Sequence, residues 1–128
     1  MLNQRVLIAD TDLTTRRVLE VALENLGADV VVRRDGGEAL AALEEAGYDF
    51  DLLLLGFEMP RASGLDVLSA VRSINSHTRV ILFGEDAAQA IVASEYGATA
   101  FVQTPTSPAE VARLMLRLQP RAAELASV

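Results

Sequence analysis

The stretch Asp51-Leu-Leu-Leu-Leu-Gly56-Phe-Glu-Met-Pro60-Arg-Ala-Ser-Gly64-Leu-Asp-Val-Leu68 carries the strongest fold signal in this chain. Its four consecutive leucines form an apolar run without alternation, which is typical of a parallel strand covered on both faces. A turn with a proline and a glycine follows, and apolar residues then recur at helical spacing as far as Val71. The stretch therefore predicts one strand followed by one amphipathic helix.

The same unit recurs along the whole chain. Aliphatic runs predict five strands, at 5–9, 28–32, 52–55, 80–83 and 100–102. Between and after them, apolar residues three and four apart predict helices. Five strand–helix units with right-handed crossovers predict an α/β fold, a (βα)5 doubly wound parallel sheet with helices on both faces.

Several residues mark the expected helix ends. Gly27 and Gly47 are placed where a left-handed residue commonly ends a helix. Ser107-Pro108-Ala109-Glu110 offers a capping serine, a proline at the first helical position and a glutamate able to close a capping box. Asp12 is interpreted as the cap of the first helix, and the fourth helix is predicted over residues 86–96.

Length and composition limit the classes of function. The 128 residues predict one domain over residues 1–118, with residues 119–128 as a tail or the start of a linker. No apolar run approaches the ~18 residues of a membrane span and no signal-peptide pattern is present, so we expect a cytoplasmic protein without a membrane partner. Cysteine is absent and histidine occurs once, which excludes thiolate catalysis and disfavours histidine-rich metal sites.

The charge pattern argues against nucleic acid as a partner. The formal net charge is −7, and the basic residues are all arginines scattered along the chain. Binding to duplex DNA depends on clustered lysines and arginines that neutralise phosphates. We therefore expect no direct binding of nucleic acid by this domain.

The motifs together resemble bacterial two-component receiver domains. The segment Met59-Pro60 to Gly64 and the segment from Gly97 to Pro105 carry the resemblance most strongly, and it extends from Arg5 to about Leu118. The resemblance implies a flavodoxin-like fold and a role in two-component signal transduction, as the receiver of a response regulator.

The resemblance also assigns roles to five positions at the carboxyl ends of the strands. It places the first metal-binding acid on Asp10, the second on Thr11, the phosphate-accepting aspartate on Gly56, the hydroxyl residue on Gly84 and the lysine on Thr104. Four of these five positions lack the side chain that the family uses. Glycine cannot form an acyl phosphate, and loss of the acids removes the reason for a divalent cation.

These departures lead to the leading interpretation, a degenerate pseudo-receiver. We expect a phosphorylation-independent module that acts by protein–protein interaction, without enzymatic activity and without a cofactor. No metal is expected, although Asp10 and Glu58 leave weak cation binding open.

The resemblance implies that the contact surface is the face formed by the fourth helix, the fifth strand and the fifth helix. The candidate contact residues, for a protein partner or a second copy of the chain, are Ala88, Ile91, Val92, Tyr96 and Phe101. The alternative for this face is plain packing, with the alanines against the sheet and Phe101 fixed in the core.

A second hypothesis is a small-ligand sensor that uses the vacated phosphorylation pocket. Its lining would be small, at Thr11, Gly56, Gly84 and Thr104, which leaves room for a bound molecule. The retained Asp10 and the missing lysine argue against a strongly anionic ligand. Residual phosphotransfer through another acceptor is the weakest of the alternatives.

Overall fold

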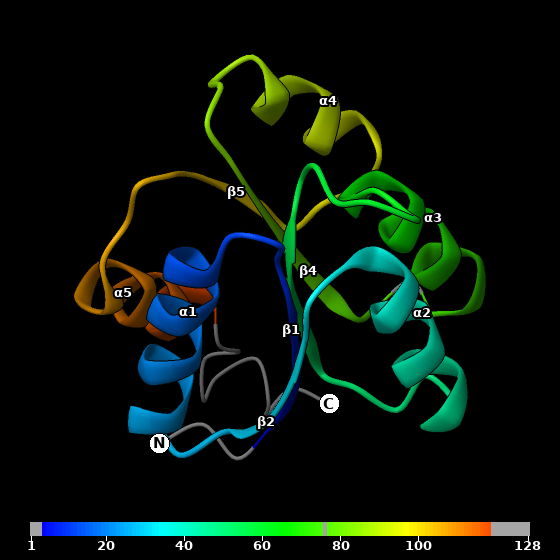
Figure 1. Ribbon diagram of the computed structural model, residues 1–128, viewed down its shortest axis with the longest axis horizontal. Helices are drawn as coiled ribbons and strands as arrows, with labels where there is room; N and C mark the ends of the chain where they lie inside the picture. Colours follow the sequence, from blue (N-terminus) through cyan, green and yellow to red (C-terminus); the bar gives the residue numbers. More distant parts are fainter. Residues whose placement is uncertain (1–3, 76, 119–128) are drawn as a thin grey trace, which may run out of the picture.

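The computed structural model describes residues 4–75 and 77–118, and in them the chain folds as an alternation of strands and helices. A five-stranded parallel sheet has the order β2-β1-β3-β4-β5, with every neighbouring pair parallel. Figure 1 shows the sheet with helices on both of its faces. The predicted doubly wound (βα)5 fold is confirmed.

The bounds of the elements lie close to those predicted. The strands are β1 (Arg5–Ala9), β2 (Asp29–Arg33), β3 (Leu52–Gly56), β4 (Arg79–Gly84) and β5 (Ala100–Gln103). The helices are α1 (Leu13–Asn25), α2 (Gly36–Glu45), α3 (Gly64–Ile74), α4 (Gln89–Glu95) and α5 (Pro108–Leu118). None of the helices in the described ranges is long and apolar enough to cross a membrane.

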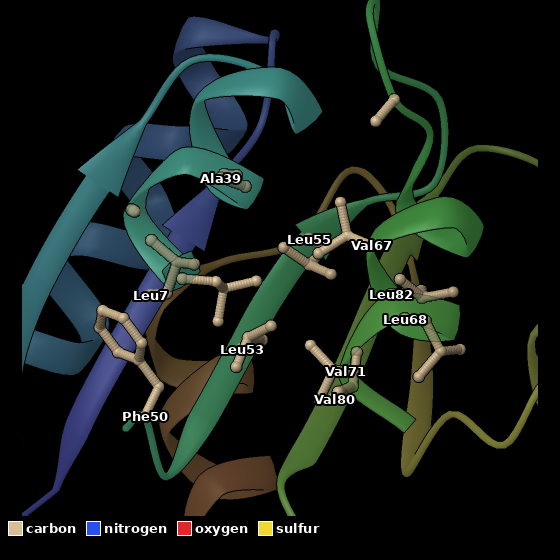
Figure 2. Close-up of a cluster of buried hydrophobic side chains, with 14 of the residues drawn as sticks. Leu7, Ala39, Phe50, Leu53, Leu55, Val67, Leu68, Val71, Val80 and Leu82 are labelled. Atoms are coloured by element: carbon tan, nitrogen blue, oxygen red, sulfur yellow. The ribbon is translucent and has the colours of Figure 1, made fainter. Parts of the chain in front are cut away.

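Two apolar clusters hold the layers together, one on each face of the sheet. Successive strand residues alternate between them, so that Leu53 and Leu55 pack beneath α2 and α3 while Leu52 and Leu54 pack beneath α1 and α5. Figure 2 shows the first cluster, with α3 side chains lying against β3 and β4. The leucines of β3 are at most 2% exposed, and full burial of each leucine contributes about 1.5–3 kcal/mol.

Local signals at the helix ends are largely confirmed. Gly27 and Gly47 adopt positive φ angles of 85° and 62° just after α1 and α2. Asp12 caps α1, because its carboxylate accepts the N–H of Thr15 at 3.1 Å. Ser63 and Asp66 form a reciprocal capping box at the start of α3, a feature that our sequence analysis did not predict.

One predicted helix start and one predicted capping bond differ from the structure. The helix predicted over residues 86–96 begins only at Gln89 and ends at Glu95. The Asp86 carboxylate accepts the N–H of Ala88 at 2.9 Å, and such a side-chain bond favours a turn over a helix. At α5, Ser107 accepts the N–H of Glu110 at 3.2 Å as predicted, but the Glu110 carboxylate bonds the Thr106 hydroxyl instead of completing a capping box.

Candidate functional site

A pocket of about 330 Å³ opens at the carboxyl ends of β1, β3 and β4. All five positions singled out from the sequence line it, namely Asp10, Thr11, Gly56, Gly84 and Thr104. They come together because parallel strands end at the same edge of the sheet, where functional groups of such folds gather.

The lining of this pocket is strongly acidic. Five carboxylates contribute to it, and no arginine occurs among the described residues that line it; the five are Asp10, Asp12, Glu58, Glu85 and Asp86. An acidic, water-accessible wall repels phosphate and other anions and attracts cations. The pocket is therefore unsuited to an anionic group.

Asp10 is the most deeply placed of these acids. It is 7% exposed, and its Oδ1 accepts the backbone N–H of Asp12 at 2.9 Å. Burial raises the pKa of Asp10 to about 6, although the Asp12 N–H opposes this rise by stabilising the carboxylate. The Arg16 guanidinium bonds the backbone carbonyl of Asp10 at 2.8 Å. Asp10 therefore holds a buried charge that its surroundings compensate only in part.

The end of β3 brings Gly56 directly against this carboxylate. A Cβ atom built on Gly56 would lie 3.0 Å from Oδ2 and 3.1 Å from Cγ of Asp10. Contacts this short require the Asp10 side chain to shift by a few tenths of an ångström. The carboxylate of Asp10 thus leaves little room for a side chain at position 56.

The end of β4 is covered by a side chain that our sequence analysis missed. The amide of Gln89 lies over Gly84, and a Cβ atom on that glycine would overlap with its Oε1. The Nε2 of Gln89 donates to Oε1 of Glu58 at 3.2 Å, across the mouth of the pocket. The sequence contained only an indirect signal for this role of Gln89. A glycine at the end of a strand leaves room that a long polar side chain nearby can fill.

The two threonines have different surroundings. Thr11 is exposed at the rim, whereas Thr104 is half-buried and its N–H donates to the carbonyl of Gly84 at 2.8 Å. The peptide bond between Thr104 and Pro105 is cis. The hydrogen bond from Thr104 to Gly84 ties the end of β5 to the end of β4 beside the pocket.

The acids of the pocket do not converge on a metal centre. In residues 4–75 and 77–118 no group of three or more histidine, cysteine, aspartate or glutamate side chains is placed to hold an ion. Asp10 and Glu58 both line the pocket, but Glu58 already accepts the bond from Gln89. Binding of a cation here would leave most of its coordination shell to water.

The predicted contact face is partly exposed. On α4, Ile91 is 65% exposed and the adjoining Tyr96 is 49% exposed, while Ala88 is exposed and Val92 is half-buried. Phe101 on β5 is half-buried and packs edge-on against Phe57, with ring centroids 6.4 Å apart. This packing favours the core role over the contact role for Phe101.

A groove between β5 and α5 continues this face. Its volume is about 600 Å³, and its lining includes Phe101, Val102, Leu114 and Leu116 with the two arginines Arg113 and Arg117. Leu116 is 57% exposed. Glu110 is the one carboxylate that the described part of the chain contributes to this lining, so the groove combines apolar surface with an excess of positive charge, in contrast to the acidic pocket.

Comparison with known proteins identifies the family. The family model of the response regulator receiver domain matches residues 6–115. The chain belongs to this family. It is 33% identical over 120 residues to the DNA-binding response regulator MtrA of Mycolicibacterium smegmatis, covering 92% of this chain and 52% of MtrA. It is 34% identical over 116 residues to the transcriptional regulatory protein YkoG of Bacillus subtilis, covering 89% of this chain and 49% of that protein.

Solved receiver structures share the fold. The chemotaxis response regulator CheY4 of Vibrio cholerae superposes with a TM-score of 0.81 at 24% identity, covering 92% of this chain and all of CheY4. The receiver domain of the Francisella response regulator 1452 gives 0.77 at 27% identity, with coverage of 91% and 96%. The chain spans about half the length of the curated relatives MtrA and YkoG.

Proposed function

We propose that this receiver domain is a phosphorylation-independent signalling module, a pseudo-receiver that acts by binding protein in a two-component-type pathway of the cytoplasm. One observation carries the proposal above all others: β3 ends at Gly56, and the carboxylate of Asp10 lies in the space against it. An acyl phosphate needs a carboxylate, and glycine supplies none.

The rest of the pocket supports the same conclusion. Thr11 and Thr104 are neutral, so they bring no charge to a metal ion or to a phosphoryl group. Five carboxylates in the lining would repel an incoming phosphate donor. A receiver with this pocket has neither the nucleophile nor the electrostatics for phosphoryl transfer, and we propose that it is not an enzyme.

We propose that the contact surface is formed by α4, β5 and α5. Ile91, Tyr96 and Leu116 expose large apolar side chains there, and Arg113 and Arg117 add positive charge in the groove beside them. Apolar area rimmed by charge is typical of a protein-binding surface. The occupant is a second copy of the chain or a different protein, and we expect no direct binding of DNA by this domain.

Three measurements test the proposal together. Incubation with acetyl phosphate and Mg²⁺ is expected to leave the intact mass unchanged, with a phosphorylatable receiver domain as the positive control. Sedimentation velocity over a range of concentrations then reports self-association, and affinity capture on the immobilised domain reports other partners. Addition of one phosphoryl group would contradict the proposal at once.

The pocket also supports a second candidate, a sensor of a small ligand. The observation that favours it is the cavity of about 330 Å³ with an acidic lining, which would select a cationic molecule. An amide NMR titration with Mg²⁺, then with beryllofluoride, and then with a small organic amine separates the candidates. Saturable shifts confined to Asp10, Gly56 and Gly84 would make ligand sensing the leading function.

A further inference from the structure

Helix α4 is the least anchored helix at its N-terminal end. It has seven residues, of which Ala93 is buried. Its N-cap position is Ala88, which has no polar side-chain atom to bond the free N–H groups of the first turn. The four residues before the helix, 85–88, are all exposed. Something other than core packing must therefore place this end of the helix.

Two glutamines make the bonds that cross to this end from elsewhere in the fold. Gln89, the first residue of α4, donates from Nε2 to Glu58 in the β3–α3 loop at 3.2 Å. Gln103 at the end of β5 donates to the carbonyl of Glu85 at 3.0 Å. The Oε1 of Gln89 also faces the N–H of Asp86 at 3.4 Å, which is a long contact.

The absence of a side chain at Gly84 makes the position of Gln89 sterically allowed. A Cβ atom on Gly84 would overlap with Oε1 of Gln89 and would lie 3.2 Å from Cε1 of Phe101. The amide therefore lies in the space that any other residue at position 84 would fill. The C-terminal end of α4 is tied separately, because Arg72 of α3 donates to the carbonyl of Gly97 at 3.1 Å.

We propose that Gln89 is a positioning residue that fixes α4 from across the pocket. Its amide lies over Gly84 and donates a hydrogen bond to the Glu58 carboxylate. This Gln89–Glu58 bridge fixes the N-terminal end of α4 without a bound partner or a phosphoryl group. A hydrogen bond to an ionised group is stronger than one between neutral groups. The consequence for signalling rests on the proposed function, since it keeps the α4 surface in one arrangement without phosphate.

Hydrogen exchange of backbone amides tests the bridge without any partner. Gln89→Ala removes the amide but keeps a good helix former, and exchange over residues 85–92 is expected to rise about tenfold, as for one charged hydrogen bond. Ser94→Ala is the matched control, because it trims an exposed polar side chain on the same helix. Exchange in β1 and α3 is expected to stay unchanged in both variants, which shows that the fold is intact.

A charge exchange makes the test specific to the pair. Gln89→Glu places two carboxylates face to face and is expected to raise exchange more than Gln89→Ala. Combining it with Glu58→Gln restores a donor and an acceptor with their roles exchanged, so exchange is expected to return to within about threefold of the parent chain. Gly84→Ala is expected to expel the amide, and adding Gln89→Ala to it should then have no further effect.

Unchanged hydrogen exchange over residues 85–92 in Gln89→Ala would contradict the proposed Gln89–Glu58 bridge. The bridge would also be contradicted if the combined Gln89→Glu and Glu58→Gln variant exchanged as fast as Gln89→Glu alone. Neither result depends on the proposed function, which fails separately if acetyl phosphate modifies the parent chain. A rise in the Ser94→Ala control equal to that in Gln89→Ala would also contradict the proposal. It would show that any trimmed polar side chain loosens this helix.

Discussion

The two ends of the sheet are both rich in acids, but they differ in how the charge is compensated. At the amino end, Arg5 lies 4.0 Å from Asp29 and 3.8 Å from Asp49, stacks on Phe50 at 4.7 Å, and donates its backbone N–H to Asp51. At the carboxyl end, five carboxylates line the pocket without an arginine among its described lining residues.

The acids at the two ends therefore have different effects on the stability of the fold. Exposed acids around one arginine stabilise the amino end by a small amount, because water screens each pair. At the other end Asp10 is buried beside a glycine with its pKa raised to about 6, so its charge opposes folding at neutral pH. The pocket therefore tolerates an unfavourable group that the core of the sheet would exclude.

The largest effect is expected when a second carboxylate is added to the pocket end. Gly56→Asp places its Cβ about 3.0 Å from Asp10, and two buried like charges oppose each other. We expect a loss of about 2–4 kcal/mol in the free energy of unfolding at pH 7. Urea denaturation measures it, and we expect no labelling by acetyl phosphate because Thr11 and Thr104 stay neutral.

The matched control for this variant is Gly56→Asn, which has nearly the same shape without the charge. It should lose distinctly less stability than Gly56→Asp at pH 7, and the two should converge near pH 4. Equal losses at both pH values would assign the effect to size alone. Rapid labelling of Gly56→Asp would show that the neutral threonines matter less than we argue.

The next effect removes the buried charge. Asp10→Asn is expected to raise the free energy of unfolding at pH 7 by about 1–2 kcal/mol. The folded pKa of Asp10, about 6, exceeds the ordinary value of 3.8. This difference corresponds to a destabilisation of at most about 3 kcal/mol. Screening by water at the pocket mouth makes the actual destabilisation smaller.

The sign of the pH dependence follows from the same pKa. Because the folded pKa is raised, the carboxyl group costs nothing below pH 3.8, and its penalty grows as the pH rises through 6. The parent chain should thus gain stability relative to Asp10→Asn as the pH falls from 7 to 4. Urea denaturation at several pH values measures this. A parallel pair of pH profiles, or a large loss in Asp10→Asn, would show instead that the carboxylate anchors the site.

A smaller effect is expected at the amino end. Arg5→Met keeps the aliphatic stem over Phe50 but removes the charge, and we expect a loss of about 1 kcal/mol that shrinks in high salt. Arg17→Met is the control, since its exposed pair with Glu20 spans 3.6 Å and should contribute about 0.5 kcal/mol or less. A salt-independent loss would indicate packing rather than charge as the cause.

The elements of the fold and the place of the pocket could be predicted from the sequence. The leucine run of β3 and the helical spacing after it have one compact solution, a strand buried on both faces, and the structure has that strand. The carboxyl ends of the strands follow from the topology, so the pocket positions could be gathered before any side chain was placed. These inferences depend on period and chain direction, which are local properties of the sequence.

Side-chain placement across loops was not predictable in this way. Gln89 reaches Glu58 over 31 positions of sequence, and no periodic pattern links the two residues. The delayed start of α4 also depended on one side-chain bond, from Ala88 to Asp86, that competes with the helix. Single polar side-chain bonds, one long-range and one local, decide such details.

The smallest effect on stability is expected on the exposed surface near the pocket end. Ile91→Glu adds an acid to α4 at a position that is 65% exposed, and we expect a change within about 0.5 kcal/mol. If α4 is part of the contact surface, this variant should nevertheless weaken the self-association or partner complex at least tenfold, because the added charge must be buried.

Ser94→Glu, also exposed on α4, is the control for added charge alone. Equal binding by Ile91→Glu and the parent chain, measured by sedimentation velocity, would move the contact surface away from α4. A carboxylate at the pocket end would then affect the protein only where it is buried, as at Asp10.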